Sequence, residues 1–105
     1  MGVPPFPRRV TTRWASFSVV AVHNAREVTG LTLKELLAVP GVEQMTRIKG
    51  RSHEQAVRVP TELLEAAAQD REAVAAAIAD YTSGGSDAAL RARIREIIAA
   101  REPSA

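Results

Sequence analysis

The chain of 105 residues has no cysteine and only four aromatic residues: two Phe, one Trp and one Tyr. The lack of cysteine excludes disulfides, thiolate nucleophiles and metal sites that need sulfur ligands. The shortage of aromatic rings argues against binding single-stranded nucleic acid on a stacking platform. No run of 18 apolar residues occurs, and the apolar stretch at 17–22 is too short for a signal-peptide core. We therefore expect a cytoplasmic protein without a membrane span.

Groups that could carry catalysis are also few. The only histidines, His23 and His53, have no pair of carboxylates beside them at metal-ligand spacing. Gly84-Gly85 lacks the lysine and hydroxyl residue of a phosphate-binding loop. We predict that the chain is not an enzyme and uses no metal or other cofactor.

Charge is segregated along the chain, although the formal net charge is only +2. Residues 1–18 carry three arginines and no acid, and residues 47–58 carry four basic residues against Glu54 alone. Residues 59–82 reverse the sign, with five acidic residues against one arginine. This order indicates an anionic partner for the basic segments and a different partner for the rest. Ordinary solvated faces are the alternative interpretation.

Local signals predict the elements of the first half. The expected elements are a flexible basic tail at 1–13, a strand at 17–22, a helix from Asn24 to Gly30 and a helix from Thr32 to Pro40. The strand is predicted because residues 17–22 are short and rich in β-branched side chains. Both helices are predicted to begin with a capping box, Asn24 with Glu27 and Thr32 with Glu35.

Residues 42–49 can be interpreted in two ways. Val42, Met45 and Ile48 recur every three residues, which fits a helix. However, a turn signal at 50–52 and a strand-like run ending at Pro60 favour a β-hairpin over 43–59. Arg47, Lys49 and Arg51 alternate, so on a strand they would share one face, about 6–7 Å apart. That spacing resembles successive phosphates of a nucleic acid.

The second half is predicted to be helical. We expect one helix over 61–82, a flexible Gly-Gly-Ser break, and a final helix that begins at Ser86 or Asp87 and ends at Pro103. The apolar stripe of the final helix consists of Leu90, Ile94, Ile97 and Ile98. Such a stripe cannot bury itself alone, so it must fold back, dimerise or fill a groove on a partner.

These elements predict an α+β fold: a small antiparallel sheet with an N-terminal helix pair and two C-terminal helices. An all-α helix-turn-helix domain is the alternative. We predict a domain at 14–82 that dimerises and binds DNA. Residues 83–105 would form a hinged amphipathic arm that binds a partner.

Several segments together are similar to the prevent-host-death (Phd/YefM) family of antitoxins. The matching segments are a strand leading into Asn24-Ala25-Arg26, then Leu36-Leu37, Met45-Thr46-Arg47, Gly50-Arg51 and Ala56-Val57-Arg58-Val59-Pro60. The resemblance covers roughly residues 17–68.

The resemblance implies a homodimer that binds operator DNA and a C-terminal region that neutralises a cognate toxin protein. Side chains contacting the DNA backbone would be Arg26, Arg47, Lys49 and Arg51. Side chains facing the toxin would be Tyr81, Leu90, Ile94, Ile97 and Ile98.

A second resemblance is to helix-turn-helix regulators of the phage-repressor type. Residues 25–37 are similar to the first two helices of that family, and Gly41-Val42 falls where its turn belongs. In that alternative the protein would be a transcriptional regulator without a toxin partner, and residues 42–49 would start the recognition helix.

Overall fold

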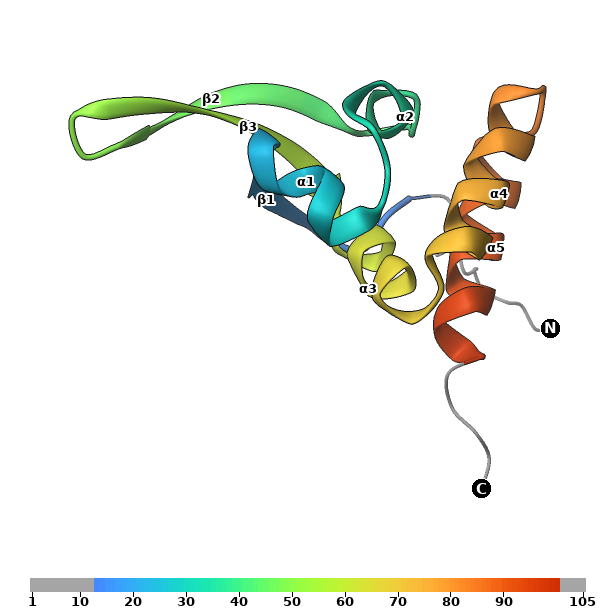
Figure 1. Ribbon diagram of the computed structural model, residues 1–105. Helices are drawn as coiled ribbons and strands as arrows, with labels where there is room; N and C mark the ends of the chain where they lie inside the picture. The colour runs from blue at the N-terminus through green and yellow to red at the C-terminus, as the bar shows by residue number, and fades with distance from the viewer. Residues whose placement is uncertain (1–12, 101–105) are drawn as a thin grey trace, which may run out of the picture.

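A computed structural model describes residues 13–100, which form one three-stranded antiparallel sheet and five helices (Figure 1). In chain order the elements are β1 (Phe17–Ala21), α1 (Val22–Thr29), α2 (Leu33–Leu37), β2 (Glu43–Lys49), β3 (Ser52–Pro60), α3 (Thr61–Gln69), α4 (Arg71–Thr82) and α5 (Asp87–Ala99). The predicted α+β class is confirmed, and the all-α alternative is wrong. Most of the predicted tail at 1–13, and the predicted helix end at Pro103, lie outside the described residues.

Strand β3 lies in the middle of the sheet, in the order β1-β3-β2. Residues 56–60, the inner half of β3, pair with β1, from Phe17↔Pro60 to Ala21↔Ala56. On its other side β3 pairs with β2, from Glu43↔Arg58 to Lys49↔Ser52. Residues 43–49 are therefore a strand and not a recognition helix. The predicted hairpin over 43–59 is confirmed, and its second strand, β3, begins at Ser52.

Helix α1 begins at Val22, directly after β1, so the predicted start at Asn24 is wrong. Its N-cap is Ala21, whose side chain makes no capping hydrogen bond. The reason is tertiary: Ala21 is buried in the sheet, and Ala25 is buried one turn later. The predicted end at Gly30 is confirmed, because this residue has φ 78° and its N–H donates to the Arg26 carbonyl.

Helix α2 has the predicted capping box. The Glu35 N–H donates to Thr32 Oγ1 at 3.1 Å, and the Thr32 N–H donates to Glu35 Oε1 at 2.8 Å. Both hydrogen bonds satisfy backbone or side-chain groups within four residues, so this helix start needs no distant partner.

The helix expected over 61–82 is two helices, which corrects the predicted pair of C-terminal helices to three. Asp70 breaks the run with an extended backbone (φ −159°, ψ 92°). Its carboxylate accepts a hydrogen bond from the Ala73 N–H at 3.1 Å and so caps α4. The break lets both helices bury an apolar face, which includes Leu63 on α3 and Ile78 on α4.

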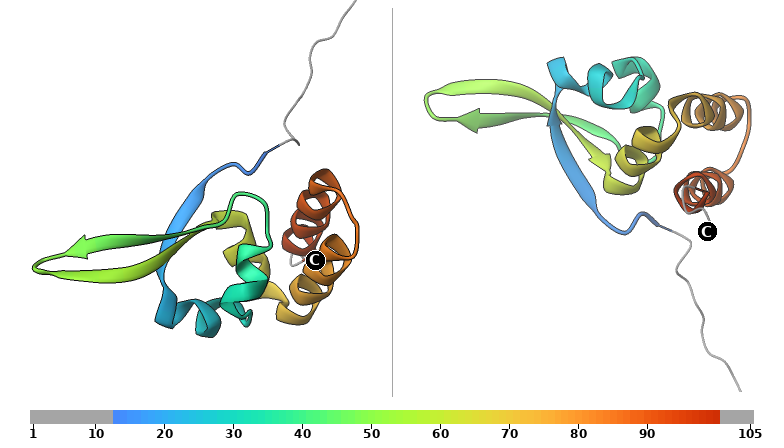
Figure 2. Two further views of the ribbon diagram at one scale, coloured as in Figure 1. Left: turned by 90° about the horizontal axis from the view of Figure 1, so that it is seen from above. Right: turned by 60° about the horizontal axis from the view of Figure 1, so that its bottom comes forward.

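Helix α5 folds back against α3 and α4 (Figure 2). It begins with the predicted cap, since Ser86 Oγ accepts from the Ala89 N–H at 3.1 Å. Leu90, Ile94 and Ile97 have exposed fractions of 3%, 0% and 4%. The sequence left three possibilities for this stripe: folding back, dimerisation or binding in a partner's groove. In this conformation the stripe folds back onto the chain's own helices.

One ion pair joins three segments that are distant in the sequence: α5, α3 and the residues before β1. Arg95 donates to both carboxylate oxygens of Glu62 on α3, at 2.8 and 3.1 Å, and also to the Arg13 carbonyl at 2.8 Å. Glu62 additionally accepts from the Ala15 N–H at 3.3 Å. The Arg95 guanidinium holds the pKa of the Glu62 carboxyl below its ordinary value.

Trp14 closes the core beside this ion pair. Its ring is buried, its indole N–H donates to the Pro40 carbonyl at 2.8 Å, and the Arg91 guanidinium lies 5.4 Å from the ring centroid. The residues just before β1 are thereby tied both to α5 and to the loop between α2 and β2.

The hairpin extends far from this core. The described chain measures 58 × 33 × 30 Å with a radius of gyration of 15.6 Å, against about 12–13 Å for a compact domain of this length. Figure 1 shows that the excess length is the outer half of β2 and β3. None of the helices between residues 13 and 100 is long and apolar enough to span a bilayer.

If α5 is part of the core, Ile94→Ala should lower the free energy of unfolding by about 2–5 kcal/mol, because it leaves a cavity between three helices. Ile48→Ala is the matched control: its side chain is 72% exposed, so the change should stay within about 0.5 kcal/mol. Urea denaturation followed by circular dichroism measures both. An equal loss of unfolding free energy in the two variants would contradict the packing of α5.

Candidate functional site

The outer part of the hairpin is a free two-stranded ribbon. Strand β1 pairs with β3 only from Ala56 onward, so among residues 13–100 the segments 46–49 and 52–55 pair only with each other. Four such pairs extend about 14 Å. A two-residue turn, Gly50-Arg51, joins the strands, and Gly50 has the positive φ (66°) that such turns require at this position.

One face of the ribbon, which we call the basic face, carries Arg47, Lys49, Ser52 and Glu54. Arg47 Nε donates to Glu54 Oε1 at 2.8 Å across the strands. This hydrogen bond, together with the nearby charge of Lys49, holds the pKa of Glu54 below its ordinary value. Arg47 is therefore partly neutralised by its neighbour.

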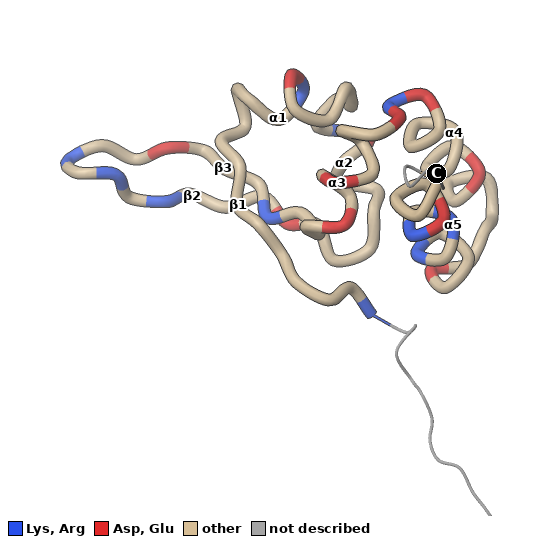
Figure 3. Tube along the Cα trace, turned by 90° about the horizontal axis from the view of Figure 1, so that it is seen from below, with Lys and Arg blue, Asp and Glu red and all other residues tan. Residues whose placement is uncertain are grey.

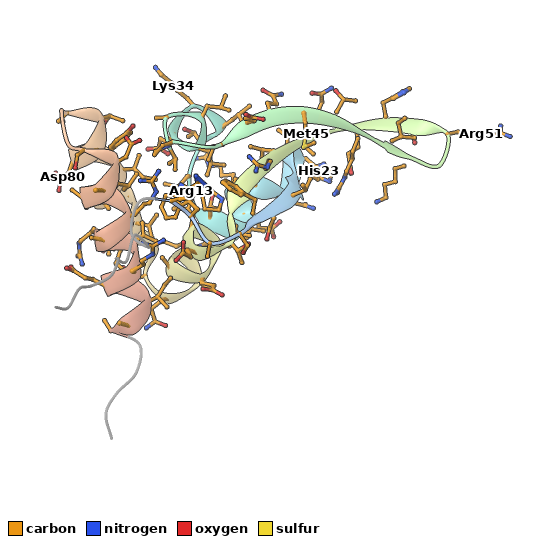
Figure 4. All side chains as sticks on the ribbon, turned by 180° about the vertical axis from the view of Figure 1, so that it is seen from behind. Arg13, His23, Lys34, Met45, Arg51 and Asp80 are labelled. Atoms are coloured by element: carbon orange, nitrogen blue, oxygen red, sulfur yellow. The ribbon has the colours of Figure 1, made fainter. Side chains whose placement is uncertain are left out.

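Lys49 and Arg51 are exposed cations at the end of the hairpin. Figure 3 shows that basic residues gather at this end of the molecule. Neither makes an ion pair with any residue between 13 and 100. Arg51 lies in the turn, so the expected alternation on one strand face holds for Arg47 and Lys49 only. In Figure 4 Arg51 points away from the body of the molecule.

The opposite face of the ribbon, which we call the amide face, has no acidic residue and no Lys or Arg. It carries Gln44, Thr46, Ile48, His53 and Gln55. Gln44 Nε2 donates to Gln55 Oε1 at 3.3 Å, and Gln55 Nε2 donates to Thr46 Oγ1 at 3.2 Å. Sequence reasoning did not single out this face, although its residues alternate with the basic ones along β2.

Two other arginines, Arg26 and Arg58, lie away from the ribbon end. Arg26 is exposed on α1, which lies over the body of the molecule and not beside the turn (Figure 1). Arg58 lies at the base of the hairpin, 3.7 Å from the centroid of the Phe17 ring, and donates to the Gly41 carbonyl at 3.3 Å. The fold thus brings Arg47, Lys49 and Arg51 together and leaves Arg26 apart.

The residues expected to face a toxin are mostly in the core. Leu90, Ile94 and Ile97 are buried, whereas Tyr81 and Ile98 are half-buried. The Tyr81 hydroxyl hydrogen-bonds to Asp87 at 2.8 Å, which ties α4 to the start of α5 and raises the pKa of Tyr81. Tyr81 and Leu90 also line a pocket of about 220 Å³ between the two helices. In this conformation α5 is an integral helix, and its apolar stripe is available to a partner only if α5 detaches.

Both histidines are exposed, His23 on α1 and His53 on β3. Between residues 13 and 100 no three side chains among His, Asp and Glu come together in a way that could hold a metal ion. The candidate functional site is therefore the projecting β2–β3 ribbon, which has one cationic face and one uncharged polar face.

Comparison with known proteins adds no relative: no protein-family model, curated protein or solved structure matches this chain.

Because Arg47 is the main cause of the low pKa of Glu54, Arg47→Gln should raise that pKa toward the ordinary glutamate value. A pH titration of the Glu54 carboxyl carbon by NMR measures it. Lys49→Gln should move the same pKa less, since Lys49 makes no hydrogen bond to the carboxylate. A larger shift with Lys49→Gln would contradict the cross-strand pair.

Proposed function

We propose that this protein is the antitoxin of a type II toxin–antitoxin module, which binds operator DNA as a homodimer in the cytoplasm and neutralises a toxin protein through its C-terminal helices. The observation that carries the proposal is the projecting β2–β3 ribbon with unpaired cations at its end. The order of strand, helix pair and basic hairpin is also the one that the antitoxin resemblance implies.

The dimensions and charge of the ribbon support duplex DNA as its ligand. A major groove about 12 Å wide admits a two-stranded ribbon. Lys49 and Arg51, which no acid within residues 13–100 neutralises, can approach the phosphates on either side. A ribbon whose only role was to cover the core would not need to extend beyond β1.

A dimer would present two such ribbons to a symmetric operator. The sheet has two edges, β1 and β2, that are unpaired within the described residues. Each exposes backbone groups that could pair with a second copy of the chain.

The C-terminal helices are the part of the chain proposed to meet the toxin. The buried stripe of α5 is held by Glu62–Arg95 and by Tyr81–Asp87. Both contacts are polar and partly exposed, so each is weak. Detachment also exposes the buried Leu90, Ile94 and Ile97, so the toxin must offer these side chains equivalent apolar burial. The proposal is that α5 leaves α3 and α4 and carries Leu90, Ile94 and Ile97 to the toxin.

Removing both free cations should weaken binding to a short synthetic duplex. For Lys49→Ala combined with Arg51→Ala, the slope of log K against log salt concentration should fall by about 1 for each side chain, because fewer counterions are released. Fluorescence anisotropy at several salt concentrations measures this.

The control for that experiment is Lys34→Ala, which removes an exposed cation on α2, far from the ribbon (Figure 4). It should leave the slope unchanged. If the wild type binds no duplex even at low salt, the protein is an interaction module without a nucleic-acid role.

The second test concerns the toxin. If α5 must detach, Glu62→Gln should raise the apparent affinity for the protein encoded by the adjacent reading frame, because it removes the ion pair that holds α5. The same variant should lower Tm. Isothermal titration calorimetry and thermal denaturation measure the two quantities.

Glu65→Gln is the matched control, since Glu65 is exposed on the same helix. A lower Tm without a gain in affinity would contradict detachment of α5. Absence of any complex would leave a DNA-binding regulator without a toxin partner.

A further inference from the structure

The two faces of the ribbon differ in chemistry, and this difference carries an inference beyond DNA binding itself. We propose that the amide face reads A·T base pairs on the floor of the major groove, while Lys49 and Arg51 contact the phosphates. The inference rests on the proposed binding of duplex DNA. It assigns sequence specificity to residues that carry no formal charge.

Gln55 has the hydrogen-bonding groups that adenine requires. A glutamine recognises adenine by accepting from N6 and donating to N7. One N–H of Gln55 is used by Thr46, and one acceptor site of its carbonyl oxygen is used by Gln44. A glutamine amide has two N–H donors and two acceptor lone pairs, so one of each is left for a base. The two neighbours also hold the amide in a defined orientation.

Ile48 supplies an apolar contact on the same face. It is opposite His53 in the second pair from the turn, and its side chain is 72% exposed, the most exposed of the large apolar residues between 13 and 100. A face that served only for solubility would carry a polar residue there. In the major groove, the thymine methyl group is the apolar feature that such a side chain can contact.

The location of the charged residues fits this orientation. The only acid of the free ribbon, Glu54, lies on the basic face with Arg47, so the amide face meets the bases without a carboxylate. Arg51 extends from the turn, and Lys49 belongs to the basic face, which this orientation turns away from the bases. Their long side chains can reach the phosphate ridges from the end and the edge of the ribbon. A free ribbon of about 14 Å matches about four base pairs at 3.4 Å each.

The test begins with selection of binding sites from a randomised duplex library by the full chain. The enriched duplex and a scrambled duplex of the same composition are then compared at one salt concentration. Wild type should enrich a short A·T-containing site. Gln55→Ala and Ile48→Ala should each reduce the affinity ratio between the two duplexes by about tenfold.

Two controls separate base contacts from backbone contacts. Lys49→Ala should weaken binding to both duplexes equally. Gln69→Ala, which removes an exposed amide at the end of α3, should change neither affinity. The fold of each variant is checked by its circular dichroism spectrum.

Modified bases then test the individual contacts. Replacing adenine by 7-deazaadenine removes the N7 acceptor, and replacing thymine by uracil removes the methyl group; both groups lie in the major groove. The first change should weaken wild type but not Gln55→Ala, and the second should weaken wild type but not Ile48→Ala.

The outcomes distinguish this inference from the proposed function. Binding without enrichment of any sequence, or an affinity ratio that Gln55→Ala and Ile48→Ala leave unchanged, would overturn base reading while DNA binding stands. Failure of the wild type to bind any duplex at low salt would overturn both.

Discussion

The central position of β3 is the constraint on which the rest of the molecule depends. Its inner half, from Ala56 to Pro60, is buried except for the half-buried Arg58, and it leads without a loop into α3. Val57 and Val59 extend the helical core onto the sheet. Within the described part of the chain the outer half has only β2 as a partner, so the same strand anchors the core and supports the ribbon. A rigid core thereby fixes the direction in which the ribbon leaves the molecule.

The C-terminal half is held by a combination of apolar burial and a few polar ties. Ile94 and Leu63 are fully buried, and burial of side chains of this size contributes about 1.5–3 kcal/mol each. The bidentate Glu62–Arg95 contact adds geometric specificity, because it fixes which face of α5 meets α3. A helix that is held in this way can be well ordered in the free protein and still be exchangeable against a partner that offers equivalent burial.

Much of the fold was predictable from local patterns, whereas the candidate site was predictable only in part. The hairpin and its cations follow from Gly50, the flanking β-branched residues and Pro60. The amide face was not predictable from local patterns, because Gln44 and Gln55 carry no charge and only the strand register brings their amides together with Thr46. The predicted start of α1 at Asn24 was wrong because the burial of Ala21 outweighs the capping preference of Asn24.

The sequence by itself determined the features that depend on contacts within a few residues. These are the cap at Thr32, the stop at Gly30, the turn at Gly50 and the cap at Ser86. Only the tertiary structure decided the return of α5 onto α3 and the length of ribbon left beyond β1. The physical reason is that a capping hydrogen bond or a positive φ is satisfied locally, whereas burial requires surfaces that distant segments supply.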